Sequence, residues 1–497
     1  MSINKTEAAE GVAGQEYFQE RQLKQGAGGW ILLAGLGVAY VISGDFSGWN
    51  NGLATGGFGG LLIAFVLMGI MYLFMIFGLA ELSSALPTAG AGYGFARRAF
   101  GKLGGFITGV SILIEYIIAP AAISCFITDY VRLLFGWESN WWLNAGIMLA
   151  FWVVFIGIQL VGAGEALKTI FAITAVAVVA LVVYVVFIIP HFDASQLFNM
   201  PPDGSALSSE FMPHGIVGTL STLVFGIWFF LGIEGVPLAA EEAKDPKKDM
   251  PRGLIIGMLC LIVFGALMLF LTPAGTTTCI NGDGVLNGEG CATGSEIIGP
   301  SGAPLILALM SAGAPTGVIL FVNIAGLAGL VASFFSLIFA ASRQLFALSR
   351  AGYLPKAVSV TSSRKVPTWC LILPGVIGFG LGGVIQDGAT MIDIAVFGAT
   401  ISYVMMSASH VWLRLKDKEL KREYLTPGGA VTTGIATVIA VIAVVSVFTY
   451  DPFASGITLV VFLALVLYFL LYSKNKVVGN APEEEFELLA AAEAELS

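Results

Sequence analysis

Long apolar stretches separated by short polar segments are the dominant pattern of this 497-residue chain. Each stretch is roughly 20 residues long or longer, which suits an α-helix that crosses the hydrocarbon core of a bilayer. Only 11% of the residues are charged, against about 25% in soluble domains. The pattern predicts an all-α polytopic membrane protein with twelve transmembrane helices, near residues 30–53, 57–80, 104–134, 142–162, 167–189, 214–240, 253–275, 315–347, 369–386, 389–412, 431–450 and 453–472.

The basic residues fall on alternate connections between these helices. With the amino terminus in the cytoplasm, every Lys and Arg except Arg132 lies on the cytoplasmic side, as the positive-inside rule requires. We therefore expect a multi-pass protein of the plasma (inner) membrane with both termini in the cytoplasm. Two long connections, 190–212 and 276–312, would face outward, and neither contains Lys or Arg.

The chain divides into four predicted parts. Residues 1–29 form a cytoplasmic N-terminal segment, and residues 30–412 form a transport core of ten spans. Two further spans occupy residues 413–472, and an acidic cytoplasmic tail occupies residues 473–497. The glutamates of the tail predict a disordered, solvated end, with a partner-binding role as the alternative. The sequence indicates no oligomeric state.

One acidic residue, Asp45, lies in apolar sequence that otherwise holds no charge from Trp30 to Ala80. A carboxylate inside a bilayer is costly, so it usually faces a cavity and has a function. Gly44 and Gly48 lie on either side, and glycine lets a helix open and free backbone groups for a ligand. We expect a binding site for a small cation here. The alternative is that Asp45 caps the end of the broken helix.

The sixth apolar stretch also combines glycine with an acid, at Gly232 and Glu234. It follows the first by five spans, and an odd offset inverts the second unit relative to the first. This predicts a 5+5 inverted repeat in which helices 1 and 6 are broken. Glu115 lies near the middle of the third span without an intramembrane Lys or Arg partner. Glu115 either has a structural role, such as a hydrogen bond to an adjacent helix, or functions directly in transport. A cavity lined by Asp45, Glu115 and Glu234 would favour cations.

Three ordered motifs resemble the amino acid–polyamine–organocation (APC) transporter superfamily. They run from Ala80 to Gly101, from Gly232 to Pro251 and from Ser342 to Pro355, and the similarity extends from about residue 30 to residue 472. Within the superfamily, the segment from Ile42 to Asn50 looks most like the ethanolamine permease branch. The resemblance implies a secondary active transporter that works by alternating access.

The first-span break differs from that of the amino acid carriers that the chain resembles. Those carriers have roughly Gly-Ser-Gly and then an aliphatic residue, and their free N–H groups hold the substrate carboxylate. Here Ser43 and Gly44 keep the break, but Asp45 takes the aliphatic position. A carboxylate there would repel an acid and attract an ammonium group. We therefore expect import of a small cationic amine, foremost ethanolamine; choline, another amine, or a cationic or neutral amino acid are the alternatives.

The resemblance also suggests roles for other residues. The resemblance links Glu234 to gating or proton coupling; the alternative is a structural acid that is hydrogen-bonded to neighbouring backbone. Trp228 would stack on the substrate or occlude it; the alternative is that its ring only packs against lipid or a neighbouring helix. Phe46 follows Asp45 and would help to close the outer side of the site. The predicted substrate-binding residues are Ser43, Gly44, Asp45, Phe46, Glu115, Tyr116, Trp228, Gly232 and Tyr403.

The sequence leaves more than one coupling ion possible. Ser333 and Ser336 of the eighth span would offer hydroxyls to sodium, unless they bond their own backbone. Some relatives in the superfamily replace that sodium with a fifth-span lysine, but here Ala177 stands at that position. A proton on an acid, sodium at the hydroxyls and uncoupled transport all remain, and no other cofactor is expected.

The remaining residues support no other function class. Cys279 and Cys291 lie in the second long outer connection and form either a disulfide or two free thiols. The segment 281–289 misses the register of a calcium loop. The three histidines, His191, His214 and His410, are dispersed. We therefore expect no metal site, no enzymatic activity and no nucleic-acid partner, and the broken helices argue against a channel.

Overall fold

The computed structural model describes residues 29–86, 90–161, 163–279, 292–362, 364 and 366–477. Within these ranges every regular element is a helix, and 11 helices are long and apolar enough to cross a membrane. The shorter apolar helix α2 (Trp30–Val41) supplies the remaining span. The predicted all-α polytopic fold with twelve spans is confirmed. The N-terminal segment before residue 29, the acidic tail after residue 477 and the segment 281–289 lie outside the described residues.

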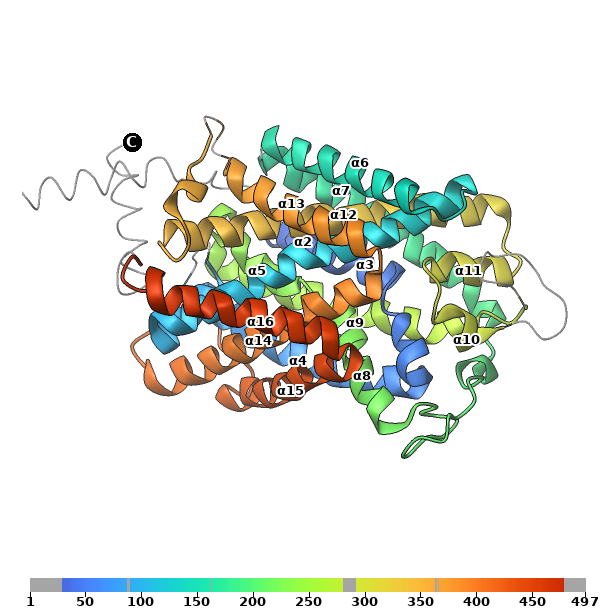
Figure 1. The fold of residues 1–497 in the computed structure, drawn as a ribbon. Helices are drawn as coiled ribbons and strands as arrows, with labels where there is room; N and C mark the ends of the chain where they lie inside the picture. Colours follow the sequence, from blue (N-terminus) through green and yellow to red (C-terminus); the bar gives the residue numbers. More distant parts are fainter. Residues whose placement is uncertain are drawn as a thin grey trace, which may run out of the picture.

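The helices form one elongated bundle in which most axes run in similar directions (Figure 1). The first span consists of α2 and the short helix α3 (Ser43–Phe46). The second to fifth spans are α4 (Asn51–Ala85), α5 (Gly92–Phe135), α6 (Trp141–Val161) and α7 (Ala163–Ile188). The sixth consists of α8 (Gly215–Trp228) and η3 (Ile233–Glu242). The others are α9 (Pro246–Ala274), α12 (Thr316–Arg350), α13 (Thr368–Ile385), α14 (Gly388–Lys416), α15 (Ala430–Tyr450) and α16 (Pro452–Tyr468), which η5 (Phe469–Ser473) continues.

Glycines with positive φ divide two of the long helices. Gly57, with φ of 70°, separates the short opening turns of α4 from the second span, and Gly101, with φ of 71°, divides α5 in the same way. Only glycine adopts such angles without strain. The boundary between the first two spans therefore lies at Gly57 itself, where the sequence pattern placed a gap between residues 53 and 57.

The two long connections, 190–212 and 276–312, which the charge pattern predicts on the outer side, are partly helical. The first contains η1 (Ile189–His191) and η2 (Ala194–Leu197), and the second contains α10 (Gly294–Ile298) and α11 (Pro304–Ser311). Helices α10 and α11 lie together at one end of the bundle (Figure 1). Pro304 occupies the first position of α11, where a missing N–H costs nothing. The apolar side chains that follow it are buried, so this segment belongs to the core although its length is too short to span a membrane.

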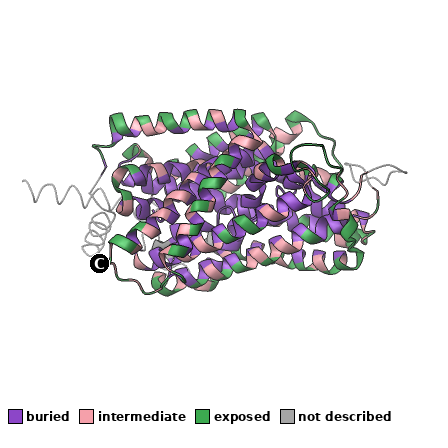
Figure 2. Ribbon diagram, turned by 90° about the horizontal axis from the view of Figure 1, so that it is seen from below, coloured by how far each residue is buried: buried purple, intermediate pink, exposed green. Residues whose placement is uncertain are grey.

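Burial distinguishes central helices from peripheral ones. In the most apolar window of α5, 83% of the residues are buried, whereas the figure for α6 is 17%. Helix α5 packs against α12, α13 and α14, and buried residues concentrate in the middle of the bundle (Figure 2). The apolar exposed faces of α6 and α7 are those that a bilayer would cover. Acids placed on α5 and α14 therefore lie inside protein and not against lipid.

A buried acid ties the second span to the tenth. Glu81, at the end of α4, is fully buried. Its carboxylate lies 3.2 Å from Nε2 of His410, 2.9 Å from Nη1 of Arg414 and 2.9 Å from Nε of Arg422. The backbone N–H of Thr426 also donates to it, over 2.7 Å. A buried carboxylate with so many donors is well compensated, so this cluster fastens α4 to α14 and to the connection that follows α14.

Candidate functional site

The first span opens between α2 and α4. Helix α2 ends at Val41, α3 covers only four residues, and Ser47 is extended, with φ of −162°. Ser333 of α12 compensates freed backbone groups on both sides: its hydroxyl accepts from the N–H of Ser43 at 2.9 Å and donates to the carbonyl of Ala39 at 2.7 Å. The predicted break is present, and α12 holds it in place.

The sixth span opens directly beside the first. Helix α8 ends at Trp228, and Gly232 has φ of +107° before η3 begins. A Cβ added to Gly44 would lie 2.6 Å from the carbonyl oxygen of Trp228. The two broken segments therefore meet backbone to backbone, an approach that only glycine permits. The indole Nε1 of Trp228 also donates to the carbonyl of Ser47, over 3.0 Å.

Asp45 lies at this junction as a buried acid without a donor. Its side chain is 1% exposed, and neither carboxylate oxygen has a hydrogen-bond partner among the described residues. A capping carboxylate would accept a backbone N–H of the following turn, and α3 has no side-chain cap. The geometry therefore opposes the capping alternative. A buried charge of this kind is costly until a ligand pairs with it.

Glu115 and Glu234 form a second acidic group near the sixth-span break. Their carboxyl groups lie close enough to interact electrostatically. Glu234 also accepts from the hydroxyl of Tyr116 at 3.2 Å and from the N–H of Gly232 at 3.3 Å. Glu115 accepts from Tyr403 at 3.3 Å through Oε1, while its Oε2 has no donor among the described residues. Two neighbouring carboxylates repel each other, so protonation of either one relieves that repulsion.

Phe46 anchors the break to the scaffold. The ring lies so close to α12 that a Cβ added at Gly329 would be 2.7 Å from it. The carbonyl of Phe46 accepts from the hydroxyl of Tyr130 at 3.0 Å. Its position in the fold therefore differs from that of Trp228, which joins the two breaks to each other. Whether Phe46 also closes the site remains a prediction.

The two serines predicted for sodium are both engaged in protein hydrogen bonds. Ser336 donates to the carbonyl of Ala332 in its own helix, over 2.7 Å, and Ser333 bridges the first-span break as described. Ala177 of α7 is fully buried, and its Cβ would lie 3.1 Å from a Cβ added at Gly329. The described contacts therefore give these hydroxyls protein partners and leave the fifth-span position apolar.

The second long connection, 276–312, is attached to the first-span break by Asn50. The side-chain amide donates to the carbonyls of Ile298, Gly299 and Ser301 over 2.7 to 2.9 Å. The hydroxyl of Ser47 donates to the carbonyl of Gly302, over 2.9 Å. Cys279, earlier in the same segment, is disulfide-bonded, and Cys291 lies outside the described residues. The sequence pattern did not single out Asn50.

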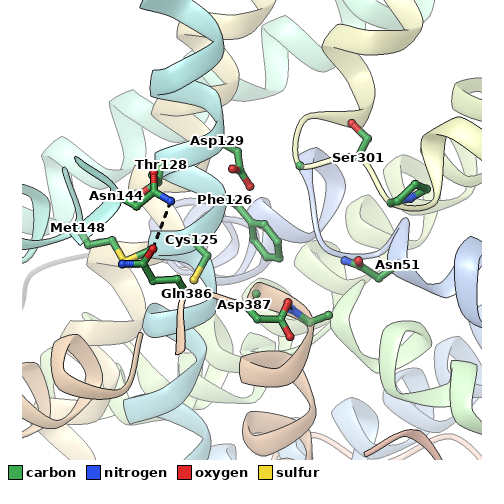
Figure 3. Close-up of a pocket in the computed structure, with 14 residues that line it drawn as sticks. Asn51, Cys125, Phe126, Thr128, Asp129, Asn144, Met148, Ser301, Gln386 and Asp387 are labelled. Carbon is green, nitrogen blue, oxygen red and sulfur yellow. Dashed lines mark hydrogen bonds between the residues drawn. The ribbon is translucent and has the colours of Figure 1, made fainter. Parts of the chain in front are cut away.

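A polar cavity of about 240 Å³ lies between the end of α5, the start of α14 and the same connection (Figure 3). None of the sequence-predicted site residues lines it. The lining side chains include two acids, Asp129 and Asp387, and the amides Asn51, Asn144 and Gln386. Phe126 forms part of its wall.

Comparison with known proteins now decides the family. The model of the amino acid permease family matches residues 30–481. The chain belongs to the amino acid permease family. It is a transporter and not an enzyme, and the predicted superfamily is confirmed at this level, whereas the ethanolamine branch remains a prediction.

Curated relatives of the permease are similar over most of its length. The branched-chain amino acid permease BcaP of Bacillus subtilis is 27% identical over 92% of this chain and 94% of its own. The methylthioribose transporter of the same organism is 27% identical over 90% and 93%. Cationic amino acid transporter 7, chloroplastic, of Arabidopsis thaliana is 28% identical over 48% of this chain and 43% of its own. None of these three is named for ethanolamine.

Some polar residues of this permease escaped the sequence analysis. Tyr72 donates to the hydroxyl of Tyr403 at 2.6 Å and so extends the hydrogen-bonded group around Glu115. Asp393 of α14 is fully buried and accepts from Ser455 at 2.8 Å. The reasoning applied to Asp45 would have found Asp393, because it too is an acid in apolar sequence. Tyr72 gave no such signal, since tyrosine is common in spans.

Proposed function

We propose that this permease imports a small organic cation without a carboxylate, foremost ethanolamine, by alternating access. The single observation that supports this most is the buried carboxylate of Asp45 at the junction of the two broken helices, which has no donor among the described residues. An ammonium group carries three N–H donors and the opposite charge. Binding it would compensate the buried acid, and charge-assisted hydrogen bonds are the strong ones.

The backbone of the break gives a substrate carboxylate few donors. The N–H of Ser43 is bonded to Ser333, and the N–H of Asp45 donates to the carbonyl of Ile42 at 3.1 Å. An anionic group here would also lie beside the carboxylate of Asp45. The arrangement therefore favours a substrate that has a hydroxyl in place of the acid.

A cationic amino acid is the second candidate. It is supported by the similarity to a relative named as a cationic amino acid transporter. Such a substrate would place its side-chain cation at Asp45 and its α-carboxylate elsewhere. A neutral amino acid has no second cation to do this, and it fits the site least well.

Competition for uptake distinguishes these substrates. In proteoliposomes that take up labelled ethanolamine, we expect unlabelled ethanolamine to compete, whereas alanine should not, because its carboxylate is repelled by Asp45. Arginine that competes better than ethanolamine would shift the assignment to cationic amino acids. Competition by alanine as strong as that by ethanolamine would refute the proposed substrate class.

We further propose that the coupling ion is a proton carried by Glu115 and Glu234. The pair joins α5 to the sixth-span break, because Glu234 also holds the N–H of Gly232. Among the described residues, the hydrogen-bond donors to these two carboxyl groups are the hydroxyls of Tyr116 and Tyr403 and the N–H of Gly232, and none is a Lys, Arg or His. Loss of the coupling proton would place two negative charges close to each other and push α5 and the break apart. Protonation is thereby connected to the movement that alternating access requires.

Replacing Glu115 with glutamine should abolish uptake driven by a pH gradient while substrate exchange persists. Glutamine keeps an oxygen that accepts from Tyr403, but it cannot release a proton. The measurement compares concentrative uptake under an imposed pH gradient with counterflow at equal pH. Asp393→Asn is the matched control, since Asp393 is also a buried acid but bonds Ser455 instead. If Glu115→Gln still accumulates substrate under the pH gradient, Glu115 does not carry the coupling proton.

A further inference from the structure

The outer cavity has the dimensions of a small binding site. Its volume is about 240 Å³, and the share of one water in the liquid is about 30 Å³. It therefore has room for a small hydrated organic ion. It is formed by segments far apart in the chain, namely α5, α6, α14 and the connection between α10 and α11 (Figure 3).

Two carboxylates give this cavity its charge. Asp129 accepts from Nη1 of Arg132 at 3.2 Å through Oδ1. Asp387 accepts from the N–H groups of Ala389 and Thr390, at 3.3 and 3.0 Å. A carboxylate has about four acceptor positions, so both acids retain lone pairs for a further donor. Figure 3 shows both acid side chains beside Phe126, and the described lining contains no Lys or Arg.

Two further features indicate a site that accepts a hydrogen-bond donor. A Cβ added to Gly302 would lie 2.4 Å from Oδ2 of Asp129, so a larger residue at this position would collide with the carboxylate. Oδ1 of Asn144 is a buried acceptor without a donor among the described residues. A buried acceptor without a donor is costly, and a bound ammonium would provide donors for both groups.

Phe126 lies between the cavity and the first-span break. It lines the cavity, and a Cβ added at Gly48 would lie 2.9 Å from its ring. The same ring packs edge-on against Trp228, with 6.2 Å between the ring centroids. Trp228 is in turn bonded to Ser47. Two aromatic side chains thus separate the cavity from the residues around Asp45.

We propose that this cavity is a second, outer cation site, in which a small ammonium ion binds between Asp129 and Asp387 before it passes Phe126 and Trp228. This rests on the cationic substrate class proposed above. The outer site collects cations, and the break at Asp45 selects among them. A field from two acids in a confined space raises the local concentration of cations.

A cysteine reporter in the cavity tests this independently of transport. Ser301 lines the cavity and is partly exposed. Ser301→Cys is placed in a chain that also carries Cys125→Ala, Cys260→Ala and Cys370→Ala, which removes the three free thiols of the described residues. The purified protein is then treated with a cationic aminoethyl thiosulfonate or an anionic sulfonatoethyl thiosulfonate. We expect the cationic reagent to react at least about tenfold faster.

The acids should account for that preference. Asp129→Asn together with Asp387→Asn should bring the two rates within about threefold of each other. Both asparagines keep an acceptor oxygen, and asparagine remains a good helix cap at position 387. Glu210→Gln is the matched control, because Glu210 is an exposed outer acid that does not line the cavity. Equal rates for the two reagents before any acid is changed would overturn the proposal.

Protection by ethanolamine separates the outer site from the inner one. We expect ethanolamine to slow the modification of Ser301→Cys, and to do so equally when Asp45→Asn is added. Protection that disappears with Asp45→Asn, or transport of ethanolamine without any protection, would refute the outer site. A third outcome is protection that depends on Asp129 and Asp387 although the protein does not transport ethanolamine. That outcome would support the outer site and refute the proposed substrate.

Discussion

Asp45→Asn should raise the KM for a cationic amine by about 100-fold. The substitution keeps the size of the side chain but removes the charge that pairs with the ammonium group. A hydrogen bond between charged groups contributes up to about 3 kcal/mol, which corresponds to that factor. Initial rates of uptake into proteoliposomes, measured over a range of ethanolamine concentrations, give the KM of both proteins.

The stability of the substrate-free protein provides the control for this prediction. Asp45 has no donor among the described residues, so Asp45→Asn breaks no hydrogen bond of the substrate-free protein, and the melting temperature in detergent should not fall. A structural role would have the opposite effect. An unchanged KM combined with a lower melting temperature would show that Asp45 supports the break and does not bind the substrate.

Gly44→Ala should abolish transport almost completely. The added methyl group would lie 2.6 Å from the carbonyl oxygen of Trp228 and 3.5 Å from the Cα of Phe229. Both are backbone atoms, so the two broken segments must separate. Overpacking of this kind costs about 1–3 kcal/mol and occasionally more. Uptake rate per folded molecule and melting temperature together measure the effect.

Gly157→Ala is the matched control for Gly44→Ala. Gly157 lies in α6, and a Cβ added there meets nothing within 4 Å. Alanine is the better helix former by about 1 kcal/mol, so this variant should transport normally and melt at the same or a higher temperature. Normal uptake by Gly44→Ala would show that the close approach of the two breaks is not needed for transport.

The helices could be predicted from the sequence because their apolar composition and length follow directly from the bilayer. The absence of charge from Trp30 to Ala80 makes Asp45 stand out without any knowledge of the fold. Glycine beside an acid at two points five spans apart was enough to predict both broken helices. The three sequence motifs predicted the transporter superfamily, and the match of the amino acid permease model to residues 30–481 confirms that prediction at the level of the family.

The hydrophobic pattern of the sequence did not predict the short helices α10 and α11 or the glycines that divide α4 and α5. The segment 276–312 read as a loop because its apolar runs are too short to span a membrane, yet α10 and α11 form part of the core. Gly57 and Gly101 differ from the other glycines of α4 and α5 in having a positive φ, and that angle depends on how the flanking helices pack. Residue type alone does not determine that angle.

For the site, the sequence determined which acids lie within apolar spans, and the tertiary structure decided what each one meets. Glu115 and Glu234 are far apart in the chain, and only the packing of α5 against the sixth-span break brings their carboxyl groups together. The partners of Ser333, the contact of Gly44 with Trp228 and the outer cavity likewise join distant segments. Apolar composition and charge are local properties that determine directly whether a segment enters the bilayer. A contact between distant residues, in contrast, exists only after the helices have packed.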